Sequence, residues 1–155
     1  MKKSIKLIAS VFCILLFSGC SPIGTKVSTC TMDNDHSKSG YKIYSTYKIY
    51  SKKDVVSKVE SEDVLSSKNT TIIAFFEKDY NDRYSAESKK YKGIKYDVKK
   101  SDDKIISKLI MDYSKIDMTE YIKNNSAMKS YVNKDNKLTL EGAKSMYESI
   151  GAKCK

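Results

Sequence analysis

Four cysteines provide the most reactive side chains of this 155-residue chain, and they stand at positions 13, 20, 30 and 154. Cys20 is set apart by what precedes it: a head with three lysines, an eleven-residue apolar run from Leu7 to Phe17, and the small pair Ser18-Gly19. This three-part layout is typical of a secretory signal. As a helix the apolar run would span about 16 Å, against roughly 30 Å of membrane hydrocarbon, so it is too short for a permanent transmembrane span.

The residues Phe17-Ser18-Gly19-Cys20 resemble the lipobox read by lipoprotein-processing enzymes, although Leu is more usual than Phe at the first position. In such signals the cysteine sulfur receives a diacylglyceryl group, and cleavage makes the cysteine the new N-terminus. The pattern predicts a signal peptide over residues 1–19 and a lipidated tether over residues 20–25. Two acyl chains anchor a protein stably, so we expect it on the extracytoplasmic face of the cell membrane. A plain signal peptide with an incidental cysteine is the alternative.

Cys13 lies within the predicted signal and Cys20 is taken by lipid, which leaves Cys30 and Cys154 near the two ends of the remaining chain. In an exported domain such a pair predicts a disulfide. Closing a loop of about 125 residues would stabilise the fold by roughly 4 to 5 kcal/mol in the chain-entropy model. Two free thiols are the alternative. We expect no metal site, because zinc usually takes three or four protein ligands and the one histidine, His36, lies in a polar stretch.

Other side chains suited to catalysis are present but form no recognisable set. No G-x-S-x-G motif precedes a predicted helix. The acidic pairs Glu60/Glu62 and Asp102/Asp103 fall in an exposed strand and a turn, where carboxylates are normally solvated. The sequence contains no P-loop, dinucleotide-binding glycine fingerprint or EF-hand loop. We therefore expect a protein that is not an enzyme and that needs no cofactor.

The chain is basic, with 29 basic and 19 acidic residues and a formal net charge of +10 at pH 7. Residues 1–19 hold three lysines and no acid, so 26 basic and 19 acidic residues remain after them, a net charge of +7. Nucleic-acid binding would need these lysines gathered on one face with stacking aromatics or a known motif. They are scattered instead, often between apolar residues. We expect solvated strand faces and no nucleic acid partner; attraction to an anionic envelope polymer or to lipid headgroups is the alternative.

A repeat offset by six residues, Tyr41-Lys42-Ile43-Tyr44 and Tyr47-Lys48-Ile49-Tyr50, predicts one long strand. Because six is even, both copies present equivalent residues to the same face of an extended chain. Tyrosine favours half-buried sheet faces in general. A functional interpretation makes the outward residues Tyr44, Lys48 and Tyr50 a contact surface.

The remaining elements follow from periodicity and capping residues. Strands are predicted at residues 27–32, 55–64, 94–99 and 104–113, with a polar loop at 33–40 and a helical turn near 117–123. A helix is predicted from Asn69 or Thr70, with Gly93 past its end, and a second from Thr139 to Ile150 before Gly151. The apolar stripe of this second helix is Leu140, Ala143, Met146 and Ile150. The order predicts a single small α+β domain over residues 26–155, a mostly antiparallel sheet covered by two helices.

Three phrases within this layout resemble the YehR-like family of bacterial lipoproteins, a domain of unknown function. They are Ser28-Thr29-Cys30, Tyr91-Lys92-Gly93-Ile94-Lys95-Tyr96 and Asp112-Tyr113-Ser114-Lys115-Ile116-Asp117. The resemblance covers most of residues 26–150, and the chain departs from the usual pattern between Ser66 and Asp79. It implies a small α+β fold on a lipid anchor and no catalytic or cofactor-binding residues.

A tethered domain without catalytic residues is expected to be a binding or structural module of the cell envelope. The partner would reach it at Tyr44, Lys48 and Tyr50, and an anionic envelope polymer or a partner protein is the expected class. The alternative is a ligand-capturing accessory component of an import system. That alternative requires an enclosed apolar pocket between the sheet and a helix.

Overall fold

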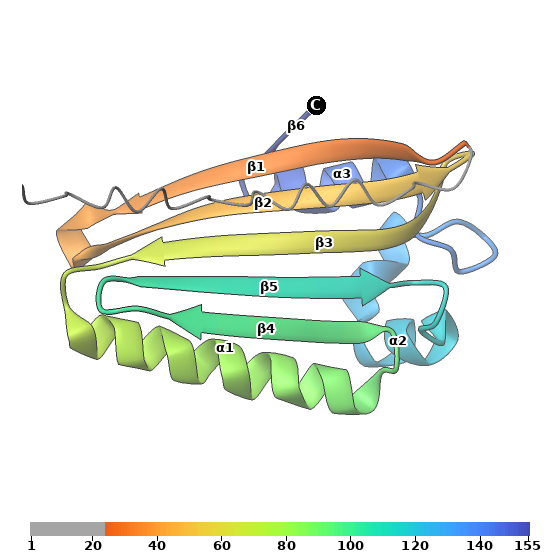
Figure 1. Cartoon of the computed structure of the whole chain (residues 1–155). Helices are drawn as coiled ribbons and strands as arrows, with labels where there is room; N and C mark the ends of the chain where they lie inside the picture. Colours follow the sequence, from red (N-terminus) through yellow and green to blue (C-terminus); the bar gives the residue numbers. More distant parts are fainter. Residues whose placement is uncertain (1–23) are drawn as a thin grey trace, which may run out of the picture.

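One antiparallel sheet of six strands forms the centre of the computed structural model, which describes residues 24–155 (Figure 1). The predicted signal peptide and Cys20 lie outside the described residues. The strand order across the sheet is β4-β5-β3-β2-β1-β6. The strands are β1 Lys26–His36, β2 Tyr41–Lys52, β3 Val55–Ser66, β4 Ile94–Lys100, β5 Lys104–Asp112 and β6 Lys153–Cys154.

β2 is the long strand that the six-residue repeat predicts. Tyr47 and Ile49 are buried on one face, whereas Lys48 between them is exposed on the other. The chain then reverses into β3 at Lys53 and Asp54, whose φ angles are 53° and 73°. Two successive left-handed residues are the signature of a type I′ hairpin turn, whose twist matches that of the flanking strands.

β1 is longer than its sequence predicts. Asp33 to His36 continue the strand in place of the predicted loop, and each residue pairs with β2, from Asp33 opposite Tyr44 to His36 opposite Tyr41. Pairing with the neighbouring strand outweighs the low strand propensity of Asp and Asn. The turn shrinks to the 3₁₀ helix η1, Ser37–Ser39, and to Gly40, whose φ of 86° is accessible to glycine without steric cost.

The helices begin at the predicted capping residues. The Asn69 side chain accepts a hydrogen bond from the Thr71 backbone N–H at 2.9 Å, and Thr139 accepts one from Gly142 N–H at 2.9 Å. Such bonds satisfy backbone donors that have no partner in the first helical turn. The α-helices are α1 Thr70–Lys90, α2 Met118–Asn124 and α3 Leu140–Ser149, and a second 3₁₀ helix, η2, spans Ser126–Tyr131.

Gly93 was predicted to mark the end of α1, but the structure requires a glycine there for a different reason. α1 ends at Lys90, its C-cap residue Tyr91 is extended, and Gly93 does not have a positive φ. A Cβ atom at this position would collide with the Asp112 backbone carbonyl and lie 2.6 Å from Cγ1 of Ile116. Glycine is therefore required because the start of β4 passes close to the end of β5.

All three α-helices cover the same face of the sheet, where they form two apolar clusters. The first lies under α2, α3 and η2 and includes Ile49 and Val59; the second lies under α1 and includes Leu65 and Ile105. Val59 and Leu65 share a face because they are six residues apart on one strand. In Figure 1, α1 runs along β4, and α3 lies behind β1 and β2. The α+β prediction is confirmed, with α2 and η2 as further cover.

The buried stripe of α3 differs from the predicted one. Ala143 is fully buried as expected, but Ile150 is 56% exposed and Tyr147 is buried in its place. Tyr147 stacks on Tyr47 of β2, and this contact fixes the rotation of the helix. Gly151 follows the helix with a φ of 98°, the left-handed conformation expected of a residue after a helix end.

Cys30 and Cys154 form the predicted disulfide, which joins β1 to β6 across 124 residues. The two residues lie directly opposite each other in the sheet, with Cα atoms 3.9 Å apart. Cys30 is fully buried in the first apolar cluster. The bond thereby fastens the C-terminal end of the chain to the edge of the sheet.

Among residues 24–155, no helix combines the length and apolar character that crossing a membrane requires.

Candidate functional site

The second face of the sheet is covered by none of the elements in residues 24–155, and we call it the open face. It is assembled from alternate residues of five strands, because alternate residues of a strand point to the same side. The strand registers place the following side chains on it: Val27, Thr29, Thr31, Asp33 and Asp35 of β1; Lys42, Tyr44, Thr46, Lys48 and Tyr50 of β2; Lys58, Glu60, Glu62, Val64 and Ser66 of β3; Lys95, Asp97 and Lys99 of β4; Lys104, Ile106, Lys108, Ile110 and Asp112 of β5.

Three apolar side chains lie side by side on the middle strands of the open face, near the end of the sheet where β2 and β5 begin. Tyr44 pairs with Val64, and Val64 pairs with Ile106. Val64 and Ile106 are half-buried, and Tyr44 is 48% exposed although it is a large side chain. We call these three residues the apolar row. Adjacent apolar groups that stay in contact with solvent are typical of a surface that a partner covers.

Ion pairs flank the apolar row on both sides. Lys108 of β5 pairs with Glu62 of β3 at 3.1 Å, and Lys42 of β2 pairs with Asp35 of β1 at 2.6 Å. Two further pairs on the open face join Lys58 to Glu60 at 2.7 Å and Lys99 to Asp97 at 3.5 Å. These charges largely neutralise each other, so the face does not present a uniformly basic surface.

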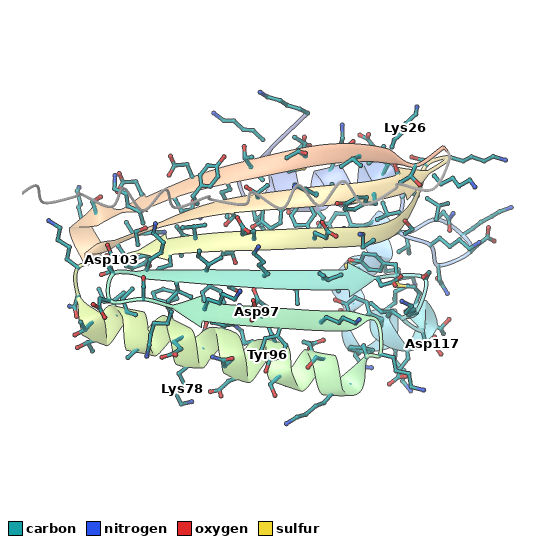
Figure 2. The ribbon with its side chains drawn as sticks, viewed as in Figure 1. Lys26, Lys78, Tyr96, Asp97, Asp103 and Asp117 are labelled. Carbon is teal, nitrogen blue, oxygen red and sulfur yellow. A yellow bond between two sulfur atoms is a disulfide. The ribbon has the colours of Figure 1, made fainter. Side chains whose placement is uncertain are left out.

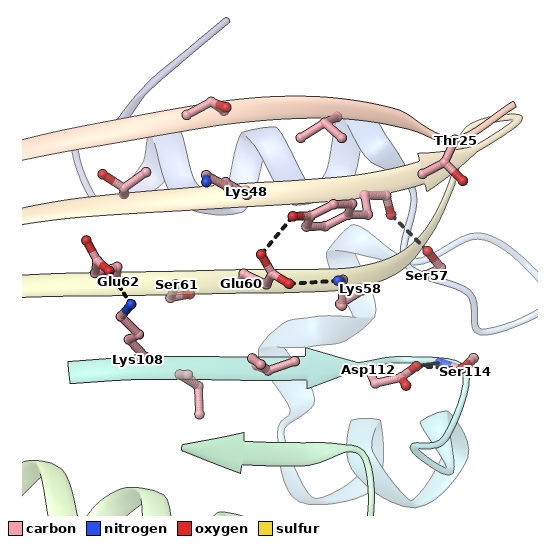
Figure 3. Close-up of a pocket in the computed structure, with 16 residues that line it drawn as sticks. Thr25, Lys48, Ser57, Lys58, Glu60, Ser61, Glu62, Lys108, Asp112 and Ser114 are labelled. Atoms are coloured by element: carbon pink, nitrogen blue, oxygen red, sulfur yellow. Dashed lines mark hydrogen bonds and ion pairs between the residues drawn. The ribbon is translucent and has the colours of Figure 1, made fainter. Parts of the chain in front are cut away.

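A broad groove of about 1060 Å³ lies on the open face next to the apolar row (Figure 3). Glu60 is its best-connected side chain: it accepts hydrogen bonds from Tyr50 Oη at 2.7 Å and from Lys58 Nζ at 2.7 Å. Burial acts to raise the pKa of Glu60, but the bonds from Lys58 and Tyr50 outweigh it, and the pKa is lowered. Burial and the neighbouring carboxylate raise the pKa of Tyr50 to about 12. The groove therefore holds a carboxylate and a neutral phenol at physiological pH.

The three residues predicted as a contact surface lie on the open face but have different environments. Lys48 and Tyr50 line the groove, and Tyr44 belongs to the apolar row. Lys48 is exposed and forms no ion pair with any described residue. Tyr50 is held by Glu60 and by Lys58, whose Nζ lies 4.0 Å from the centre of the Tyr50 ring. Tyr44 and Lys48 are thus the side chains most available to a partner.

The acidic pairs and the histidine singled out in the sequence do not meet. Glu60 and Glu62 are each engaged by a lysine on the open face, whereas Asp102 and Asp103 lie in the turn between β4 and β5. His36 is exposed at the end of β1 and stacks on Tyr41, with ring centroids 4.8 Å apart. Within residues 24–155, no three side chains of His, Cys, Asp or Glu are grouped as a metal ion would require.

A polar cluster that the sequence did not suggest lies on the helix-covered face, between the two apolar clusters. Ser45, Asp63 and Ser107 are cross-strand neighbours on β2, β3 and β5. The Asp63 Oδ1 and Ser107 Oγ atoms are buried and have no hydrogen-bond partner among the described residues. Burial raises the pKa of Asp63, although Ser45, Arg83 and Tyr80 act in the opposite direction. The cluster carries a cost in stability, because buried polar atoms without partners are unfavourable.

No protein-family model matches this chain, and no curated protein matches it. Solved structures with the same fold include an NMR structure of a protein from Streptococcus pneumoniae TIGR4, which is 14% identical, with 100% of this chain and 94% of that chain covered and a TM-score of 0.53. They also include the NMR structure of Escherichia coli YehR, which is 18% identical, with 85% of this chain and 93% of that chain covered and a TM-score of 0.54.

YehR is therefore a structural neighbour of this chain, and the α+β fold implied by the resemblance to YehR-like lipoproteins is confirmed. At these identities the likeness concerns the fold. A shared fold does not carry a function with it, so the function must be argued from the surfaces of this chain.

Proposed function

We propose that this protein is a non-catalytic binding module, anchored to the outer side of a membrane by lipid on Cys20, whose open face holds a partner protein. The observation that carries the proposal is the apolar row. Tyr44, Val64 and Ile106 stay accessible on three adjacent strands of a sheet face that no described element covers. An apolar strip surrounded by polar and charged groups is the usual anatomy of a protein interface.

A protein fits this surface better than an anionic polymer does. A polymer of phosphate or uronate units would be attracted by lysines without acidic neighbours. On the open face, Lys42, Lys58, Lys99 and Lys108 are instead paired with carboxylates. Alternating charges around an apolar strip favour a partner with its own alternating charges, because such complementarity fixes register and excludes wrong partners.

The alternative function, capture of a ligand for import, depends on an enclosed apolar pocket between the sheet and the helices. Buried side chains of the two apolar clusters occupy that space: Tyr147 of α3 lies in the same cluster as Ile49, and Tyr80 of α1 in the same cluster as Leu65. The groove of about 1060 Å³ lies on the opposite face and is lined by charged groups such as Lys48 and Glu60. These observations favour the binding of a macromolecule over the enclosure of a small apolar ligand.

Site-specific photocrosslinking on intact cells tests this proposal. A photoreactive amino acid is placed at Tyr44 in one chain and at Phe75 in a matched chain; Phe75 is 65% exposed but lies on α1. We expect a discrete protein adduct from position 44 that is absent from position 75 and is suppressed when Ile106→Glu is added. Equal adducts from both positions, or no adduct from position 44, would refute the assignment of the open face.

A further inference from the structure

Five lysines gather at the end of the sheet where the described chain begins. Lys26 is the first residue of β1, Lys52 and Lys53 lie at the turn between β2 and β3, and Lys134 and Lys137 lie in the loop before α3. We call them the tether-end lysines. Figure 2 shows Lys26 at this end and Asp103 at the opposite end of the sheet.

Backbone pairing holds the three segments together. Lys26 pairs with Ser51, which places the start of β1 beside the β2–β3 turn. A bridge joins Val55 to Thr139, and the Leu140 backbone N–H donates to the Asp54 carbonyl at 2.8 Å. The loop that carries Lys134 and Lys137 is therefore fixed against the turn that carries Lys53.

The tether-end lysines are all exposed, and none forms an ion pair with a residue in the described range 24–155. Two carboxylates, Asp54 and Asp135, lie among them, so this group carries an excess of three positive charges. The opposite end is balanced: Lys38, Lys68 and Lys104, which form no ion pair within the described part of the chain, stand against Asp33, Asp102 and Asp103. Net positive charge is thus concentrated at one end of the sheet.

The basic end is also the end nearest to the predicted lipid attachment. A Cβ atom built on Gly24 would lie 4.0 Å from Cε of Lys52. Three residues of sequence separate Gly24 from Cys20, and the four Cα-to-Cα steps between them reach at most about 14 Å when fully extended. A lipid on Cys20 would therefore keep this end within that distance of the bilayer surface.

We propose that the tether-end lysines bind the anionic headgroups of the membrane and so hold the sheet upright, with its open face accessible from the side. Lysines near an anionic bilayer strengthen binding by about fivefold each. The attraction acts over a Debye length of about 8 Å at physiological ionic strength, which suits groups at the very end of the fold. Membrane placement is shared with the proposed function, and the experiment below separates the two.

Amine labelling of the full chain tests the inference. The protein is expressed in a bacterium with its N-terminal segment, extracted in detergent, and reconstituted into vesicles of phosphatidylcholine alone or of phosphatidylcholine mixed with phosphatidylglycerol. A membrane-impermeant amine reagent is added, and mass spectrometry reports labelling at each lysine. We expect labelling of the tether-end lysines to fall about fivefold in the anionic vesicles, while Lys38, Lys68 and Lys104 are unchanged. Salt at about 1 M should reverse the protection.

Two matched variants with the same change in net charge provide the control. Lys53→Glu/Lys134→Glu/Lys137→Glu should abolish the protection of Lys26 and Lys52, whereas Lys38→Glu/Lys68→Glu/Lys104→Glu should leave it intact. Circular dichroism and thermal unfolding establish that both variants are folded.

Equal labelling in the two kinds of vesicle would overturn the inference, and so would an equal effect of the two variants. Stronger protection by soluble polyphosphate than by anionic vesicles would also overturn it, because the surface would then prefer a free polymer to a bilayer. The mass of the N-terminal peptide reports acyl groups on Cys20 separately. Absence of lipid there would refute the anchor of the proposed function, and the labelling pattern would still decide whether the tether-end lysines bind headgroups.

Discussion

Tyr47 of β2 stacks on Tyr147 of α3, with ring centroids 4.1 Å apart and an interplanar angle of 22°. Both side chains are buried, and the contact joins the middle of the sheet to the last helix. Because α3 leads directly into β6 and the disulfide, this pair positions the C-terminal end of the chain as well as the helix.

Removal of the Tyr147 ring should destabilise the folded chain. We expect Tyr147→Ala to lower the free energy of unfolding by about 3 to 5 kcal/mol, the range for deletion of a large buried side chain. Tyr147→Phe keeps the ring and should cost no more than about 1 kcal/mol, the net contribution of a typical hydrogen bond. Urea denaturation followed by circular dichroism measures both values, and equal stability of the two variants would contradict a role for the stacked ring.

The disulfide should contribute measurably to stability. We expect reduction of the Cys30–Cys154 bond to lower the free energy of unfolding by about 4 to 5 kcal/mol in the chain-entropy model, because the closed loop is long. Denaturation with and without a phosphine reductant measures the difference. The double variant Cys30→Ala/Cys154→Ala is the control and should not respond to the reductant. A native chain that is equally insensitive would show that the bond adds nothing.

Asp63 should make stability depend on pH in the sense opposite to most carboxylates. Burial raises its pKa in the folded chain, so the folded state binds the proton more tightly than the unfolded state does. By linkage, the Asp63 contribution to stability falls as pH rises from the unfolded pKa through the raised folded pKa, and it recovers on acidification. Glu60 and Asp112, whose pKa values are lowered, act in the reverse sense and lose their contribution as pH falls.

Comparison with Asp63→Asn isolates this effect from the other carboxylates. We expect the variant to be more stable than the native chain at pH 7 and the advantage to shrink as pH falls through the titration range of Asp63. Urea denaturation at a series of pH values measures the difference. An advantage that stays constant with pH, or a less stable variant at pH 7, would contradict a charged and poorly solvated carboxylate at this position.

Gly93 should not accept a side chain. Its Cβ would collide with the Asp112 backbone carbonyl, which cannot move without disturbing the pairing of β4 with β5. We expect Gly93→Ala to cost about 1 to 3 kcal/mol, as insertions into a packed region do. The exposed neighbour Lys92 offers the control, since Lys92→Ala should change stability by less than about 0.5 kcal/mol. Thermal unfolding compares the two variants.

Local patterns in the sequence predicted most of the fold. The repeat over residues 41–50 predicted β2 and the side to which each residue points, and Asn69 and Thr139 predicted where α1 and α3 begin. These features depend on neighbours along the chain. The extension of β1 to His36 and the burial of Tyr147 depend on contacts with β2, so propensity and helical spacing alone did not reveal them.

The candidate site was predicted only in part, because some of it also depends on contacts between distant segments of the chain. Tyr44, Lys48 and Tyr50 were placed on one face from alternation alone. The apolar row needs the registers of β2 with β3 and of β3 with β5, and the second of these joins segments about forty residues apart in sequence. Register between distant strands is set by the packed core rather than by the residues of either strand. Val64 and Ile106 therefore became candidates only in the folded structure.

Binding of the partner captured at Tyr44 decides the function of the open face. Affinity is measured for the native chain, for Tyr44→Ala/Lys48→Glu on the open face, and for the matched Phe75→Ala/Lys78→Glu on α1. We expect the first pair of substitutions to weaken binding by at least about thirtyfold, the loss typical of removing an interface hot spot, and the second pair to leave it unchanged. Equal affinity of all three chains would contradict the proposal that a partner protein binds the open face.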